Sequence, residues 1–156
     1  MERPPVLIYR LSHFFYKSRL RLVSKFIDYI NRLLFSVWLP GSATIGKNFT
    51  VGYLGLGIVV HSNATIGRNC HISQNVTIGR NFGDKLVPVL SDFVYIGTGS
   101  VVFGEINIGT NVVIGSNSVI NKSIEDNKIV VGSPFRIIGD TNGRSYTELD
   151  CNFEVR

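Results

Sequence analysis

The sequence has few of the residues that would place it in several common protein classes. Only 17% of its 156 residues are charged and 44% are hydrophobic, which excludes a disordered chain rich in charge. Its two cysteines, Cys70 and Cys151, provide neither a disulfide framework nor a zinc-binding pattern. The 16 glycines have no strict three-residue period, so the chain is not collagen-like. A single domain in a reducing, cytoplasmic setting is expected.

Acidic residues are scarce in the first quarter of the chain. Residues 1–40 carry seven Lys or Arg and two Asp or Glu, whereas residues 41–156 carry nine of each kind. The net charge of +5 therefore lies entirely in residues 1–40. A nucleic-acid-binding protein would carry a basic stripe on its main body, so we expect no nucleic-acid partner. Basic residues also interrupt the N-terminal apolar stretch, so no signal peptide is expected.

Residues 1–40 are predicted to form a basic amphipathic helical segment. Apolar residues recur through it at helical spacing, and Ser18 is a point at which it would divide into two helices. Pro40 and Gly41 end it. Three roles are open: packing on its own or a neighbouring domain, lying on an anionic membrane surface at the cytoplasmic face, or binding a partner protein.

Aliphatic residues recur every six positions after residue 40. The rungs of this ladder are Ile45, Val51, Val60, Ile66, Ile72, Ile78, Leu90, Ile96, Val102, Ile108, Ile114 and Ile120. A period of six fits neither a helix nor one long strand, but it fits a chain that turns a corner every six residues. Residues 41–139 are therefore predicted to form a parallel β-helix of triangular section. Rungs eighteen residues apart should stack, in the order Val60, Ile78, Ile96 and Ile114. A sandwich of short strands would not keep this register.

Two irregularities interrupt the ladder. Extra residues lie in the glycine-rich stretch 53–57, and Asp84 takes a rung position within the stretch 81–88. Insertions in repeat proteins often carry function. Glycines and asparagines that follow the rungs suit corners with positive φ. The polar residues 140–156 are expected to form a loose C-terminal tail.

Three stretches resemble the hexapeptide-repeat acyltransferases. They are GYLGLGIVVH at 52–61, QNVTIG at 74–79 and VVGSPFRII at 130–138, the last being similar to the family's closing segment VxGxPAKxI. The resemblance covers roughly residues 40–139 and is strongest to the serine acetyltransferase-like branch, many of whose members acetylate sugars of surface polysaccharides. It implies a left-handed parallel β-helix and a homotrimer that binds acetyl-CoA in the groove between neighbouring β-helices. It also implies direct acetyl transfer to a hydroxyl, with histidine as base.

The sequence departs from serine acetyltransferases in three places. They have an Asp-His pair just before the Gly-x-Gly-Ile-Val stretch, where this chain has Tyr53 and Leu54. They also have a second histidine shortly before a proline, where Val87 precedes Pro88 here, and a longer N-terminal helical domain. These differences favour a carbohydrate hydroxyl, of a surface polysaccharide or its precursor, as acceptor. Serine O-acetylation and a non-catalytic scaffold are the alternatives.

Attack of an alcohol on a thioester needs a general base and donors for the oxyanion. His61 directly follows rung Val60 at a corner beside the glycine-rich insertion, and it is the predicted base. His71 precedes rung Ile72 and is the second catalytic candidate, as a donor to the thioester carbonyl. In a trimer, His61 of one subunit would face His71 of another.

Further site residues are expected from position and from the resemblance. Tyr53 and Asp84 lie in the two irregular stretches and are expected to contact the acceptor. The resemblance implies CoA contacts along the last coils, with two basic residues near the phosphates, at Gly79, Gly97, Thr98, Gly115, Ser116, Lys122 and Arg136. Cys70 is at an inward position and is expected in the core rather than as a covalent nucleophile. No metal-ligand cluster stands out in the sequence.

Overall fold

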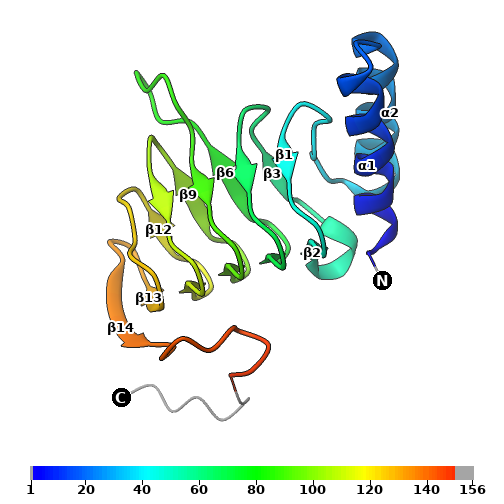
Figure 1. Ribbon diagram of the computed structural model, residues 1–156. Coiled ribbons are helices and arrows are strands. Elements are labelled where there is room, and N and C mark those ends of the chain that lie inside the picture. The colour runs from blue at the N-terminus through cyan, green and yellow to red at the C-terminus, as the bar shows by residue number, and fades with distance from the viewer. Residues whose placement is uncertain (1, 150–156) are drawn as a thin grey trace.

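The computed structural model describes residues 2–149 as a parallel β-helix with two α-helices at its N-terminal end (Figure 1). The helices are α1 (Pro4–Lys17) and α2 (Arg21–Phe35), separated at Ser18 as predicted. A short 3₁₀ segment, Gly52–Gly55, lies in the first coil. The predicted fold class, a mainly β parallel β-helix preceded by a helical segment, is confirmed.

Three sheets form the sides of the triangular coil. The first sheet contains β1 (Thr44–Ile45), β4 (Thr65–Ile66), β7 (Val89–Leu90) and β10 (Asn107–Ile108). The second contains β2 (Thr50–Val51), β5 (His71–Ile72), β8 (Tyr95–Ile96), β11 (Val113–Ile114), β13 (Lys128–Val131) and β14 (Arg136–Asp140). The third contains β3 (Val59–Val60), β6 (Thr77–Gly79), β9 (Val101–Phe103) and β12 (Val119–Ile120). Pairing is parallel except between β13 and β14, whose antiparallel hairpin closes the β-helix.

The predicted order of stacked rungs is correct for the first two coils and wrong beyond them. Val60 pairs with Ile78, but Ile78 then pairs with Val102 rather than with Ile96. Ile96 lies on the second sheet, above Ile72. Ile114 was predicted in the same stack as Val60 and also lies on the second sheet.

An external loop accounts for this shift. Residues 80–88 leave the β-helix between β6 and β7 and project from it (Figure 1). Ile78 and Leu90 therefore occupy consecutive sides of one coil although they are twelve residues apart. Asp84 lies in this loop and is not a rung of the ladder.

The corners use asparagine and glycine for different reasons. Asparagines at the corners have positive φ, for example 57° at Asn48 and 56° at Asn69, which their short polar side chains tolerate. The glycines that directly follow rungs do not share this conformation, which corrects the prediction for them. A Cβ on Gly46 would lie 2.6 Å from the carbonyl carbon of Gly67, and a Cβ on Gly97 would lie 2.6 Å from the nitrogen of Ser116. These glycines therefore allow successive coils to approach closely.

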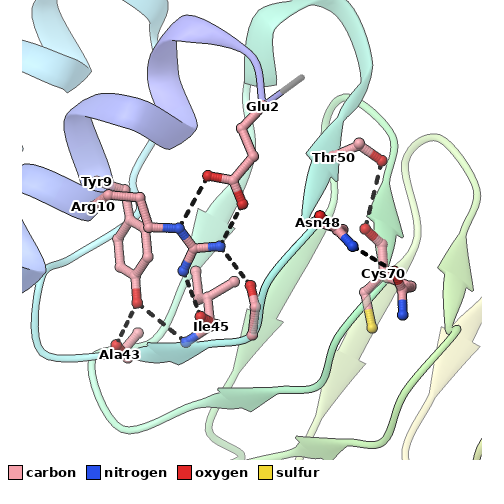
Figure 2. Close-up of polar contacts among 10 residues, drawn as sticks. Glu2, Tyr9, Arg10, Ala43, Ile45, Asn48, Thr50 and Cys70 are labelled. Atoms are coloured by element: carbon pink, nitrogen blue, oxygen red, sulfur yellow. Dashed lines mark hydrogen bonds and ion pairs between the residues drawn. The ribbon is translucent and has the colours of Figure 1, made fainter.

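Helix α1 is fastened to the first coil by polar contacts (Figure 2). The Tyr9 hydroxyl donates to the carbonyl of Ala43 at 2.8 Å and accepts from the backbone N–H of Ile45 at 3.1 Å. The guanidinium of Arg10 donates to the carbonyls of Ile45 and Gly46. The helical segment therefore packs on its own β-helix, which was one of the three predicted roles.

Helix α2 buries its polar side rather than its apolar side, and α1 buries Ser12 together with Val6 and Tyr9. Ser12 donates to a carboxylate oxygen of Asp28 at 2.5 Å and lies 2.9 Å from the hydroxyl of Ser24. Asp28 also accepts from the backbone N–H of Gly41 at 3.1 Å. Burial raises the pKa of the Asp28 carboxyl, although these donors act in the opposite direction. The apolar residues found at helical spacing consequently lie on the exposed side.

The chain after β14 does not form a loose tail as far as residue 149. Thr141 is fully buried, and the ring of Tyr146 packs against those of His71 and Tyr95 at centroid distances of 6.1 and 5.5 Å. The segment 141–149 therefore returns to the second sheet. The remainder of the predicted tail, residues 150–156, lies outside the described residues.

Candidate active site

His61 lies in a cavity of about 570 Å³ between α2 and the third sheet. Arg21, Lys25, Trp38 and Gly79 are among the other residues that line it. The Nδ1 atom of His61 accepts from the backbone N–H of Asn63 at 3.1 Å. A neutral imidazole that accepts at Nδ1 carries its hydrogen on Nε2. In this arrangement His61 offers the cavity a hydrogen-bond donor and not a free lone pair.

His71 lies in a second cavity, of about 600 Å³, at the corner after the second sheet. This cavity brings together three residues that were predicted separately, namely Tyr53, His71 and Thr98. Arg3 and Tyr95 also line it. The two histidines are therefore in different cavities of one chain, as their positions in the ladder implied.

The surroundings of His71 suit a proton acceptor. Its Nδ1 atom lies 2.9 Å from the hydroxyl oxygen of Thr50. When Nδ1–H of His71 donates to this hydroxyl, the Thr50 hydrogen is left to point to the carbonyl of Cys70 at 3.5 Å (Figure 2). The lone pair of Nε2 is then available. The ring is stacked on that of Tyr95, with centroids 5.1 Å apart and planes inclined by 10°.

The charge state of His71 follows from its environment. Burial lowers the pKa of the imidazole, and the positive charge of Arg3 lowers it further. A lowered pKa favours the neutral ring, which is the state that a general base requires.

The backbone beside this cavity is in a strained conformation. Tyr53 and Leu54 have φ values of 44° and 57°, in the left-handed region that non-glycine residues rarely occupy. Gly55 follows with φ of 82°, and a Cβ there would lie 2.8 Å from a methyl group of Val37. The side chain of Tyr53 remains 75% exposed. Such strain concentrates at binding sites, where it holds a side chain in a defined place.

The remaining predicted site residues do not gather at one point. Gly97 and Thr98 form the corner beside the His71 cavity, and Gly115 and Ser116 form the corner of the next coil along the same edge. Gly79 instead lines the His61 cavity. Each of the other three, which are Asp84, Lys122 and Arg136, lines neither of these two cavities. The roles of all these residues stay predictions.

Cys70 lies in the core as expected. It is fully buried, and its thiol donates to the carbonyl of Ser91 at 3.2 Å. Burial raises the pKa of the thiol to about 11. A covalent acyl-cysteine at this position is therefore disfavoured, because the thiolate is the nucleophilic form.

Sequence reasoning missed the residues that hold His71. Thr50, His71 and Tyr95 each precede a rung and are neighbours across β2, β5 and β8. Assigning the rungs to the correct sides would have placed these three next to each other. Tyr146 follows the repeats and carries no such signal.

Comparison with known proteins identifies similar molecules only over part of their length. No family model matches the chain. It is 34% identical to serine acetyltransferase from Bacillus pumilus (strain SAFR-032) over 71 residues, which is 46% of this chain and 32% of that protein. It is 33% identical to the Synechococcus elongatus serine acetyltransferase over 74 residues, 47% of this chain and 30% of the relative. The match thus spans about a third of these curated relatives.

Similar solved structures cover more of the chain. Serine acetyltransferase from Brucella abortus strain S19 superposes with a TM-score of 0.83 and 30% identity over 88% of this chain and 56% of that one. The Neisseria gonorrhoeae enzyme in complex with serine superposes with a TM-score of 0.80 and 27% identity, over 85% of this chain and 54% of that one. A serine acetyltransferase in complex with CoA superposes with a TM-score of 0.77 and 26% identity, over 86% of this chain and 55% of that one. These neighbours are left-handed β-helices, so the predicted handedness agrees with them.

Proposed function

We propose that the chain is an acetyl-CoA-dependent O-acetyltransferase. Its structural similarity to serine acetyltransferases, one of them in complex with CoA, supports this class. The observation that carries the proposal is the half-buried His71, whose Nδ1 atom contacts the hydroxyl of Thr50 and whose ring lines a cavity with Tyr53 and Thr98. A cavity of about 600 Å³ is within the usual range for small-molecule sites.

The residues around His71 fit the reactive end of an acetyl thioester. Ser73, Gln74 and Thr98 line the cavity and provide hydroxyl and amide donors for its carbonyl and neighbouring amide groups. Acetyl-CoA supplies the activated acetyl group. The main chain at Gly97, Thr98, Gly115 and Ser116 follows the same edge and is the proposed path for the rest of the donor.

In the proposed reaction, His71 accepts the proton of the acceptor hydroxyl at Nε2. The hydroxyl oxygen bonds to the carbonyl carbon, the carbon–sulfur bond breaks, and the proton passes from His71 to the departing thiolate. Thr50 keeps the ring in the required tautomer throughout. Positioned bases of this kind contribute roughly 10²–10⁴-fold to the rate.

His61 takes the complementary role in a homotrimer. Its Nε2–H is a donor and would stabilise negative charge on the thioester oxygen of a site shared with the next subunit. The two histidines thus exchange the roles predicted from the sequence. Co-expressing His61→Ala and His71→Ala subunits tests this, because mixed trimers regain intact sites if each site uses one histidine from each of two subunits. No recovery contradicts a shared site.

Serine is the favoured acceptor. The similar proteins are serine acetyltransferases, and one was crystallised with serine. Arg3 is the one ionised side chain among the described residues that line the His71 cavity, and a guanidinium suits an α-carboxylate. The alternative from the sequence therefore takes precedence over the carbohydrate acceptor.

A carbohydrate hydroxyl is the second candidate. Tyr53 presents an exposed aromatic ring at the cavity, where apolar sugar faces would pack. Tyr53 and Leu54 also replace the Asp-His pair that the resemblance associates with serine.

The test is thiol release from acetyl-CoA with L-serine and with a panel of free and nucleotide-linked sugars, with the product identified by mass spectrometry. O-acetylserine formation supports the proposal. An acetylated sugar alone keeps the class and changes the acceptor. Absence of turnover together with absence of CoA binding in calorimetry contradicts the proposal and favours a scaffold.

A further inference from the structure

Helices α1 and α2 expose an unusually large apolar surface. Leu22 and Leu33 are each 84% exposed, and Phe26 between them is 66% exposed. Leu11 and Phe14 of α1 are more than half exposed as well. The side chains of α2 are outward because Ser24, Asp28 and Asn31 occupy its buried side, and those of α1 lie opposite the buried Val6, Tyr9 and Ser12. Exposed apolar patches of this kind mark interaction surfaces.

The charges around this surface have one sign. Exposed basic side chains flank it at Lys17, Arg19, Arg21, Lys25 and Arg32. Both acidic residues of the helical segment are already engaged: Glu2 pairs with Arg10 at 2.6 Å, and Asp28 is buried against Ser12 and Gly41. Within residues 2–40 no acidic side chain is left to offset the basic ones.

An exposed apolar surface surrounded by basic side chains favours one kind of binding partner over another. A second copy packed through the same surface would place basic residues against basic residues, because a two-fold interface joins identical patches. An anionic bilayer instead accepts the apolar side chains at its interface and pairs the cations with lipid phosphates. No helix among the described residues is long and apolar enough to cross a membrane, so contact would lie in the plane of the interface.

We propose that α1 and α2 dock on the surface of an anionic phospholipid bilayer through Leu22, Phe26 and Leu33 and the surrounding Lys and Arg side chains. The helices are at one end of the β-helix, so its coils extend away from them (Figure 1). None of the described residues that line the His71 cavity belongs to α1 or α2, whereas Arg21, Leu22 and Lys25 also line the His61 cavity, so docking would bring the membrane next to that second cavity. This proposal is independent of the acetyl-transfer reaction and is tested without it.

Vesicle co-sedimentation of the full chain gives the test. We expect binding to phosphatidylcholine vesicles that contain phosphatidylglycerol, little binding to phosphatidylcholine alone, and weaker binding as salt rises. The double variant Phe26→Gln with Leu33→Gln should bind at least about tenfold more weakly, since it removes two apolar anchors. The double variant Lys17→Gln with Lys25→Gln should lose most of the preference for phosphatidylglycerol.

A matched control is Phe82→Gln, which removes a fully exposed phenylalanine in the external loop. It should bind as the wild type does. Circular dichroism checks that all variants remain folded. Absence of binding to anionic vesicles, equal binding to both lipid compositions, or equal loss in the Phe82 variant overturns the proposal. A molar mass by light scattering that is lower in the Phe26 and Leu33 variant than in the wild type also overturns it, in favour of contact between copies of this chain.

Discussion

The Nδ1 atom of His71 and the hydroxyl oxygen of Thr50 lie 2.9 Å apart on adjacent coils of the second sheet. This contact orients the imidazole, and with Nδ1–H as its donor, as we propose, it leaves Nε2 free to accept a proton. The Asn63 N–H imposes the opposite tautomer on His61. In the proposed mechanism, the hydrogen bond at Nδ1 therefore makes His71 the proton acceptor and His61 the hydrogen-bond donor.

Replacing Thr50 by Val should reduce kcat with little change in KM. The variant keeps the shape of the side chain and removes the acceptor of Nδ1–H, so the productive tautomer is no longer favoured. A hydrogen bond worth about 1.4 kcal/mol corresponds to a loss of roughly tenfold. Thr44→Val on β1 is the matched control, because Thr44 also precedes a rung but is exposed. Equal effects of both variants on kcat would assign Thr50 a purely structural role.

The pH dependence of kcat should follow the depressed pKa of His71. Burial and the charge of Arg3 lower that pKa below 6.5, so the neutral base persists and activity should decline only at a pH below 6.5. Arg3→Gln removes one of the two causes and should move the acidic limb toward higher pH. Profiles at saturating substrate measure this shift. A limb that stays in place in the Arg3 variant contradicts the assignment of His71.

Gly97→Ala should destabilise the fold whether or not CoA binds there. The added Cβ would lie 2.6 Å from the backbone nitrogen of Ser116 on the next coil, and the free energy of unfolding should fall by about 1–3 kcal/mol. Gly79→Ala is the control, since its nearest neighbour would be a methyl group of Thr77 at 3.8 Å. Denaturant unfolding compares the two. Equal stability of both variants would show that the coils can separate locally.

Asp28→Ala should lower the free energy of unfolding by about 2 kcal/mol, because it leaves Ser12 and the N–H of Gly41 without their acceptor. Asp28→Asn should be milder, since its carbonyl oxygen still accepts. The pKa of Asp28 is raised in the folded state, so its contribution is complete below the usual carboxyl pKa and is lost as pH rises through the raised value. Asn removes this dependence, and unfolding measured at several pH values will detect the difference. An Asn variant as unstable as the Ala variant contradicts this account.

The β-helix was predictable because its core repeats. Every rung must be aliphatic to fill the inside of a coil, so the period of six is visible without any structure. The stacking order after Ile78 was not predictable in the same way. The chain between Ile78 and Leu90 forms one corner and an external loop, and its length is the same as two sides of a coil.

The helical segment shows a second limit of sequence reasoning. Apolar periodicity identified a helix around Leu22, Phe26 and Leu33 but not which side it buries. The buried hydrogen bonds of Asp28 with Ser12 and Gly41 decide that, and they join residues far apart in the sequence. The same holds for Tyr146, which reaches His71 only through the path of the chain after β14.

The most direct test of the account compares His71→Asn with His61→Asn in acetyl transfer from acetyl-CoA to serine. Asn retains an N–H donor but accepts no proton as a base. We predict that His71→Asn lowers kcat by 10²-fold or more, whereas His61→Asn keeps activity within about tenfold of the wild type. Full turnover in His71→Asn together with its loss in His61→Asn would contradict the account and make His61 the base.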